Sequence, residues 1–112
     1  MVENYVPDRG DIVWFNVSPH VGHEQGGVRP ALVLSAMSYN RRSGMMLACP
    51  ITSKAKGYPF EVRIKAKKID GVVLADQVKN VDWHERSPEF GVRADNETVS
   101  KTQALIESLV SG

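Results

Sequence analysis

The sequence contains a single cysteine, Cys49, which excludes a disulfide framework and leaves no set of thiolates to bind a metal. Its apolar runs are only as long as a strand, well below the roughly 18 residues that a membrane-spanning helix needs. Residues 1–8 contain neither a basic leader nor an apolar run, so we expect no targeting segment. These absences predict a cytoplasmic protein with no membrane partner, and a length of 112 residues predicts a single domain spanning residues 1–112.

Net charge is also nearly absent, at +1 for the whole chain, but the charges are unevenly distributed. Between Ser53 and Lys68 the only acidic residue is Glu61, against six basic residues: Lys54, Lys56, Arg63, Lys65, Lys67 and Lys68. Lysines can protect an exposed edge strand from pairing with other chains. They can equally form a patch that follows a phosphate backbone, and the sequence leaves both interpretations open.

Short apolar segments separated by turn residues predict a mainly β protein. β-Branched and aromatic residues, or alternation of apolar and polar residues, indicate strands at 12–17, 31–35, 45–52, 60–65, 72–78 and, more briefly, 81–83. Residues 36–44 lack strand alternation and have room for one helical turn. From Asp95 the apolar spacing changes to three and four residues, which predicts a helix capped by Asp95 and ending at Gly112. We therefore expect an α+β fold, a small and partly open antiparallel barrel of SH3-like type closed by a C-terminal helix.

Three local signals add detail to this barrel. Pro50 cannot donate to a strand ladder, so the strand at 45–52 is expected to be bulged or at an edge near its end, with Thr52 aimed out of the core. Asp70-Gly71 predicts a hairpin turn before the returning strand at 72–78. Asp76 and Gln77 stand out as polar residues at the end of that otherwise buried strand.

The densest group of polar side chains lies in the loop Gly22–Pro30, directly before an apolar strand. The loop carries an imidazole, a carboxylate, an amide and a guanidinium, from His23, Glu24, Gln25 and Arg29. Two glycines in its middle allow the backbone to fold back, and Pro30 restricts Arg29 to an extended conformation. A polar, glycine-hinged loop anchored to a buried strand is typical of a catalytic or binding loop.

A barrel that sets its strand ends side by side would gather one polar set on one face: His23, Glu24, Gln25, Arg29, Thr52, Asp76 and Gln77. This set has no convincing metal-ligand spacing and no phosphate-binding glycine motif. It does suit cleavage of RNA by its own 2′-hydroxyl, which needs a proton acceptor, a proton donor and hydrogen-bond donors for the phosphate.

Roles within the set follow from the side chains. Arg29 and Thr52 could donate to phosphate oxygens, the guanidinium through two parallel hydrogen bonds. His23 is the best generic proton carrier, and either Glu24 or Asp76 could be the base.

Each of these residues also has a structural interpretation. His23 could be merely solvated, Arg29 could pair with Glu24 or Asp76, and Thr52 could simply end a strand. The tryptophans, Trp14 and Trp83, are typical of core or interface anchors, whereas Tyr58 in the basic loop could stack on a base. From the residues alone, the sequence indicates no more than binding of an anion or a nucleic acid.

Five segments, in order and with matching spacing, resemble the MazF/PemK toxins, and most closely the MazF branch of that family. The segments are residues 22–35, Tyr39-Asn40, Cys49–Ser53, Lys56–Val62 and Gly71–Val78. The resemblance covers nearly the whole chain except the stretch from about 84 to 99.

The resemblance implies the toxin of a toxin–antitoxin system, a sequence-specific and ribosome-independent endoribonuclease that cleaves single-stranded mRNA. Such enzymes need no metal or other cofactor and leave 2′,3′-cyclic phosphate and 5′-hydroxyl ends. The resemblance also implies a homodimer of barrels that are SH3-like, as in MazF and CcdB. A MazE-like antitoxin would lay an acidic tail across the RNA groove.

The family's paired arginine and threonine match Arg29 and Thr52, and its loop glutamate and glutamine match Glu24 and Gln25. His23 is present in some members only, so we expect it to help rather than to be obligatory. The residues implied to bind RNA are Gln25, Lys54, Lys56, Tyr58, Asp76 and Gln77. In one departure, Leu74 stands where PemK-like members have an arginine proposed as the proton donor. In those members the aspartate that corresponds to Asp76 is proposed as the base. Because its arginine partner is missing here, Asp76 is not assigned as the base.

Two other functions remain as alternatives to a nuclease. A gyrase poison of the CcdB type acts through an apolar, tryptophan-containing C-terminus, whereas this sequence ends Leu109-Val110-Ser111-Gly112. A non-catalytic RNA-binding barrel would share the basic residues and lack the cleavage.

Overall fold

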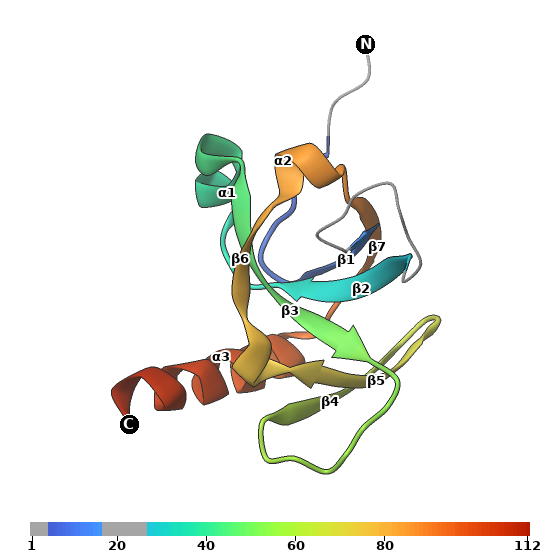
Figure 1. Ribbon diagram of the computed structural model, residues 1–112, viewed down its shortest axis with the longest axis vertical. Helices are drawn as coiled ribbons and strands as arrows, with labels where there is room; N and C mark the ends of the chain where they lie inside the picture. The colour runs from blue at the N-terminus through green and yellow to red at the C-terminus, as the bar shows by residue number, and fades with distance from the viewer. Residues whose placement is uncertain (1–4, 17–26) are drawn as a thin grey trace.

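The computed structural model describes residues 5–16 and 27–112, which form a curled antiparallel sheet with helices at its ends (Figure 1). Its strands are β1 Asp11–Asn16, β2 Val28–Val33, β3 Met45–Thr52, β4 Glu61–Ala66, β5 Ile69–Leu74, β6 Lys79–Asp82 and β7 Glu89–Arg93. The helices are α1 Met37–Ser43, the 3₁₀ turn η1 Ala75–Gln77, α2 Trp83–Arg86 and α3 Asn96–Ser111. The strand order is β4-β5-β3-β2-β1-β7, and β6 also pairs with β3. The predicted mainly β barrel with a C-terminal helix is confirmed.

β3 lies at the centre of the sheet, so the prediction that Pro50 marks an edge is wrong. One side of β3 pairs with β2, and the other side pairs with β6 through residues 45–48 and with β5 through Ile51 and Thr52. The Leu47 carbonyl accepts a hydrogen bond from Leu34 next to β2, so alternate residues of β3, including Pro50, direct their backbone groups to the other side. Pro50 therefore falls between the end of one partner strand and the start of the next, where no ladder needs an N–H. Thr52 is half-buried, as expected of a residue aimed out of the core.

The two faces of β1, β2 and β3 bury two separate clusters of apolar side chains, because side chains alternate along a strand. The first cluster lies inside the barrel and includes Ile12, Leu32, Cys49, Ile51, Val62, Val73 and Val99. The second lies on the opposite face and includes Val13, Phe15, Ala31, Val33, Met46, Ala48 and Trp83. The central strands are therefore held from both sides.

The hairpin between β4 and β5 turns at Lys67-Lys68, so the prediction of a turn at Asp70-Gly71 is wrong. Lys67 takes a left-handed conformation with φ of 43°, which supplies the tight turn that glycine usually provides. Asp70 and Gly71 instead lie within β5 and pair with β4.

Two further strands end earlier than predicted. The returning strand ends at Leu74 rather than residue 78, and Asp76 and Gln77 are exposed in η1. Trp83 begins α2 instead of ending a strand; its buried indole nitrogen donates to the Asn40 carbonyl at 2.9 Å.

The C-terminal helix α3 begins as predicted. The Asp95 carboxylate accepts a hydrogen bond from the Thr98 backbone N–H at 2.9 Å, which caps the first turn. The helix packs against η1 and β4, with Val99 buried and Leu105 and Ile106 partly buried against the first apolar cluster. Its last turns extend past the sheet (Figure 1), and Val110 is 83% exposed.

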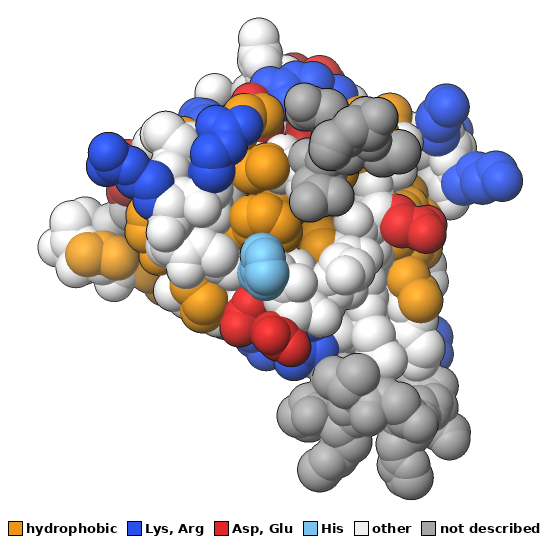
Figure 2. Space-filling model, turned by 90° about the horizontal axis from the view of Figure 1, so that it is seen from above, with side chains coloured by type: hydrophobic (Ala, Val, Ile, Leu, Met, Phe, Trp, Pro, Cys, Tyr) orange, Lys and Arg blue, Asp and Glu red, His pale blue; other side chains and the backbone are white. Residues whose placement is uncertain are grey.

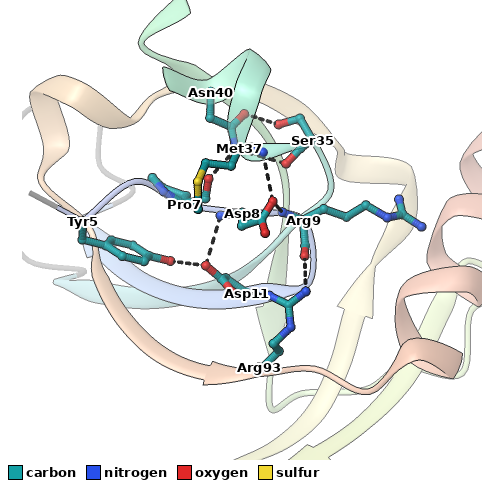
Figure 3. A network of polar contacts seen from close by, with 9 residues as sticks. All are labelled: Tyr5, Pro7, Asp8, Arg9, Asp11, Ser35, Met37, Asn40 and Arg93. Atoms are coloured by element: carbon teal, nitrogen blue, oxygen red, sulfur yellow. Dashed lines mark hydrogen bonds and ion pairs between the residues drawn. The ribbon is translucent and has the colours of Figure 1, made fainter. Parts of the chain in front are cut away.

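A polar network fixes the segment before β1 to the rest of the barrel (Figure 3). The Asp11 carboxylate, whose side chain is only 7% exposed, accepts from the Tyr5 hydroxyl at 2.5 Å and from Arg93 Nη1 at 2.7 Å. Beside it, buried Asn40 donates to the Pro7 carbonyl at 2.8 Å. Residues before β1, in α1 and in β7 are thereby tied together.

Candidate active site

Arg29 and Thr52, distant in sequence, project from the same face of two adjacent strands. The register of β2 and β3 pairs Ala31 with Pro50, and the same register continued by two residues arrives at Arg29 and Thr52. Alternation along each strand places both side chains on the face that carries Ala31 and Pro50. Both line one groove of about 940 Å³. Because Arg29 is exposed and Thr52 half-buried, both can reach a molecule bound there.

The groove is predominantly basic. Among the described residues, its charged lining consists of five cations and two carboxylates: Arg29, Lys54, Lys68, Lys79 and Arg86, with Asp70 and Asp82. An excess of cations in a concave surface attracts a polyanion and raises its local concentration. The groove is thus suited to a phosphate backbone.

Three of these cations were not proposed as site residues from the sequence. Lys68 belongs to the basic stretch 53–68, so the charge pattern of the sequence indicated it, although it was not proposed individually. Nothing in the sequence indicated Lys79 and Arg86, because they reach the groove only through the pairing of β6 with β3, in which Lys79 stands opposite Ala48. Arg86 is further oriented by a hydrogen bond of 2.5 Å from its Nη1 to the Asn16 carbonyl.

The Thr52 hydroxyl is held in a defined orientation. Its oxygen accepts a hydrogen bond from the Lys54 backbone N–H at 3.1 Å. A hydroxyl that accepts from the backbone keeps its own proton available for donation. Thr52 can therefore donate to an anion in the groove while the guanidinium of Arg29 donates from the neighbouring strand.

The other predicted site residues fall into three groups. Lys54 and Gln77 line the groove. Lys56 and Tyr58 are exposed on the loop after β3, and Asp76 is exposed on η1, but none of the three is part of the groove lining. The predicted residues of the first loop, His23, Glu24 and Gln25, lie outside the described residues.

Within residues 5–16 and 27–112, His84 is the single histidine, and it does not line the groove. It lies exposed on the face seen in Figure 2, and its ring contacts the Trp83 ring edge-on at 5.8 Å between centroids. The titratable side chains that the described residues bring to the groove are therefore its lysines, its arginines and the carboxylates of Asp70 and Asp82.

Cys49 is not placed to act as a nucleophile. Its side chain is fully buried in the first apolar cluster. Burial, and secondly the charge of Asp76, raises the pKa of its thiol to about 12, so the reactive thiolate is scarce at neutral pH.

The described part of the chain contains no group of three His, Cys, Asp or Glu side chains placed to hold a metal ion. Nor does any helix there have both the length and the apolar character needed to cross a membrane.

Comparison with known proteins places this chain in a family. A family model described as PemK-like, MazF-like toxin of type II toxin–antitoxin system matches residues 8–110. The chain belongs to this family. The resemblance drawn from the five sequence segments is thereby confirmed.

Individual relatives support membership of the MazF branch. The chain is 52% identical over 86 residues to the endoribonuclease toxin MazF of Escherichia coli K12, covering 77% of this chain and 78% of that protein. Crystalline MazF from Deinococcus radiodurans matches with a TM-score of 0.87 and 48% identity, over 97% of this chain and 100% of that one. A MazE–MazF complex from the same organism matches with a TM-score of 0.88 and 49% identity, over 96% and 98% of the two chains. The MazF-type barrel is therefore the established fold of the chain.

Proposed function

We propose that this protein is the toxin of a toxin–antitoxin system, an endoribonuclease that cleaves single-stranded mRNA at a short motif without the ribosome. The observation that carries the proposal is that Arg29 and Thr52 line the same basic groove from adjacent strands. Membership of a family whose relatives include endoribonuclease toxins supports it. Since its substrate is mRNA, the enzyme would act in the cytoplasm.

The proposed reaction is attack by the RNA's own 2′-hydroxyl on the adjacent phosphorus. A new bond forms between the 2′-oxygen and phosphorus, and the bond from phosphorus to the 5′-oxygen breaks. A base takes the 2′-hydroxyl proton and an acid returns a proton to the departing 5′-oxygen. The products are a 2′,3′-cyclic phosphate and a 5′-hydroxyl, and no metal or other cofactor enters the scheme.

Arg29 and Thr52 would stabilise the negative charge that builds up on the phosphate oxygens. The planar guanidinium can make two parallel hydrogen bonds to those oxygens, and the Thr52 hydroxyl adds a neutral donor. Arginine keeps its proton at any physiological pH, so Arg29 has an electrostatic role rather than that of a proton carrier. His23 and Glu24 are proposed to carry out the two proton transfers, from the 2′-hydroxyl and to the departing 5′-oxygen.

RNA would be held by the basic groove and the loop that borders it. Lys54 and Gln77 line the groove, and Lys56 and Tyr58 project from the adjacent loop. We also assign RNA contacts to Gln25 and Asp76. The active form is proposed to be a homodimer that a MazE-like antitoxin inhibits, in line with the MazE–MazF complex of Deinococcus radiodurans.

The decisive experiment exposes total RNA to the purified protein and maps the new 5′-hydroxyl ends. We expect cuts at one short motif, unchanged by EDTA, that disappear when the 2′-hydroxyl at the cut site is replaced by hydrogen. Cleavage of the 2′-deoxy substrate would refute the proposed chemistry, and loss of cleavage in EDTA would reveal a metal requirement. RNA that binds but stays intact would instead favour a non-catalytic RNA-binding barrel.

A further inference from the structure

Glu61 is the only acidic residue in the basic stretch 53–68, and the structure shows what its carboxylate binds. One oxygen accepts the Gly57 backbone N–H at 3.0 Å, and the other accepts the Lys56 backbone N–H at 3.0 Å. The backbone N–H of Glu61 also donates to the Tyr58 carbonyl at 3.2 Å. Glu61 opens β4, so these bonds attach the middle of the preceding loop to the rigid barrel.

The loop in question, residues 53–60, connects Thr52 at the groove to Glu61. Its side chains Lys54, Lys56 and Tyr58 are exposed, and Tyr58 is 61% exposed. Among the described residues, side-chain hydrogen bonds to the loop's backbone come only from Thr52, at Lys54, and from Glu61, at Lys56 and Gly57. Side chains thus hold the loop's backbone at two places, one of which is the Glu61 carboxylate, while backbone N–H groups of Glu61 and Ala75 bind the carbonyls of Tyr58 and Phe60 near the loop's end.

We propose that Glu61 is a positioning residue for RNA, acting through the backbone of the loop that it holds rather than by touching the substrate. Hydrogen bonds to an ionised carboxylate are roughly twice as strong as those between neutral groups, so a charged acceptor is well suited to holding this loop. If the loop is already ordered before RNA binds, binding loses less free energy to the entropic cost of fixing Lys54, Lys56 and Tyr58. This inference rests on the proposed function.

Simple electrostatics predicts the opposite effect, which makes the proposal sharply testable. Removal of the one carboxylate from a basic stretch raises the local positive charge and should strengthen binding of a polyanion. If Glu61 positions the loop, its removal weakens binding despite the gain in charge. The sign of the change therefore distinguishes the two explanations.

The experiment compares wild-type protein with Glu61→Ala, Glu61→Gln and the control Glu97→Gln. Glu97 lies on α3, pairs with Lys101 at 3.3 Å and does not line the groove, so its substitution reports the effect of charge alone. Affinity is measured with an RNA that carries a 2′-deoxy substitution at the cut site, and KM and kcat are measured with the all-ribose RNA.

We expect Glu61→Ala to weaken affinity and raise KM roughly tenfold while kcat stays near the wild-type value. Glu61→Gln, which keeps one acceptor oxygen, should recover part of the loss, and Glu97→Gln should bind as tightly as wild type or slightly more tightly. Faster hydrogen exchange at the Lys56 and Gly57 amides of Glu61→Ala would show that the loop has been released.

An affinity of Glu61→Ala equal to or above that of wild type would overturn the inference. Thermal unfolding of each variant separates this result from a general loss of structure, and Glu61→Gln serves if Glu61→Ala does not fold. A wild-type protein that binds the RNA without cutting it would refute the proposed nuclease activity, and the affinities would still test Glu61.

Discussion

Gly71 of β5 lies so close to the backbone carbonyl of Thr52 that a Cβ atom added to Gly71 would sit 2.1 Å from the carbonyl oxygen and 2.9 Å from its carbon. No side chain can occupy that space. The glycine therefore serves close packing of two strands rather than the turn that its sequence context suggested. Gly71 therefore packs directly against the backbone of Thr52, whose side chain lines the groove.

Replacing Gly71 with alanine is expected to force β5 away from β3. Overpacking of this kind costs about 1–3 kcal/mol of unfolding free energy, and Thr52 must shift with its carbonyl. We expect both a lower urea midpoint and a large loss of RNA cleavage.

Gly112→Ala is the control for added volume, since a Cβ at Gly112 meets nothing within 4 Å and any strain from its φ of 84° would fall at the end of α3, away from the groove. It should leave cleavage unchanged. Wild-type stability and activity in Gly71→Ala would contradict the close approach of the two strands.

Arg29 and Thr52 are expected to act as one unit on the same phosphate. Arg29→Ala and Thr52→Val should each reduce kcat by roughly 10²–10³-fold, the usual effect of removing one donor to developing negative charge. The double variant should lose much less than the product of the two factors, because neither donor works fully without the other.

The control for this cycle is Arg41→Ala on α1, a cation that does not line the groove. Thermal unfolding of all variants should stay close to wild type, since Arg29 is exposed and Thr52 is only half-buried. Independent, multiplicative losses would place Arg29 and Thr52 on different groups of the substrate.

Stability should fall at high pH because of Tyr5. Burial, and secondly the hydrogen bond to Asp11, raises the pKa of the Tyr5 hydroxyl well above its usual value of 10.0. The folded state therefore holds this proton more tightly than the unfolded state, so the stabilisation is complete below pH 10 and declines as the pH rises beyond it.

Urea unfolding between pH 8 and 11 measures this effect, with Tyr5→Phe as the variant that lacks the titrating group. Wild type should lose stability above about pH 10 more steeply than Tyr5→Phe. Parallel curves for the two proteins would show that the Tyr5–Asp11 contact does not persist in solution.

Cys49 should be inert in the native protein. Its thiol is fully buried and its pKa is raised to about 12, so a thiol reagent at pH 8 finds neither access nor thiolate. Labelling should appear only after denaturation, in an amount of one thiol per chain. Rapid labelling of folded protein would contradict the placement of Cys49 in the core.

Local signals were sufficient for much of the fold. The strand at 45–52 is confirmed to the residue, since its apolar run is bounded by a serine-glycine break and a basic loop. In β4, strict alternation correctly predicted that Val62 and Ile64 are buried while Arg63 and Lys65 are exposed. β7 was missed because its residues are at most half-buried and its register with β1 shifts, so no clean alternation marks it.

The site was only partly predictable for a similar reason. Arg29 and Thr52 were grouped as polar residues at strand ends and then matched to the family's arginine and threonine, and the register of β2 with β3 now supplies a geometric reason for the pair. Lys79 and Arg86 could not be predicted, since they join the groove through pairing between distant segments. Glu61 was counted only as a charge, because its hydrogen bonds to loop amides depend on how the loop folds back.

β3 belongs to both halves of the curled sheet, with β2 along one side and β6 then β5 along the other. At its Thr52 end the strand pairs with β5, and the residues just before this end, 48–50, pair with β2, so Thr52 stands on a strand that is anchored on both sides. We therefore expect a partner that silences the protein while leaving it folded to act by covering the groove, and its departure would leave the two strands that carry Arg29 and Thr52 in place.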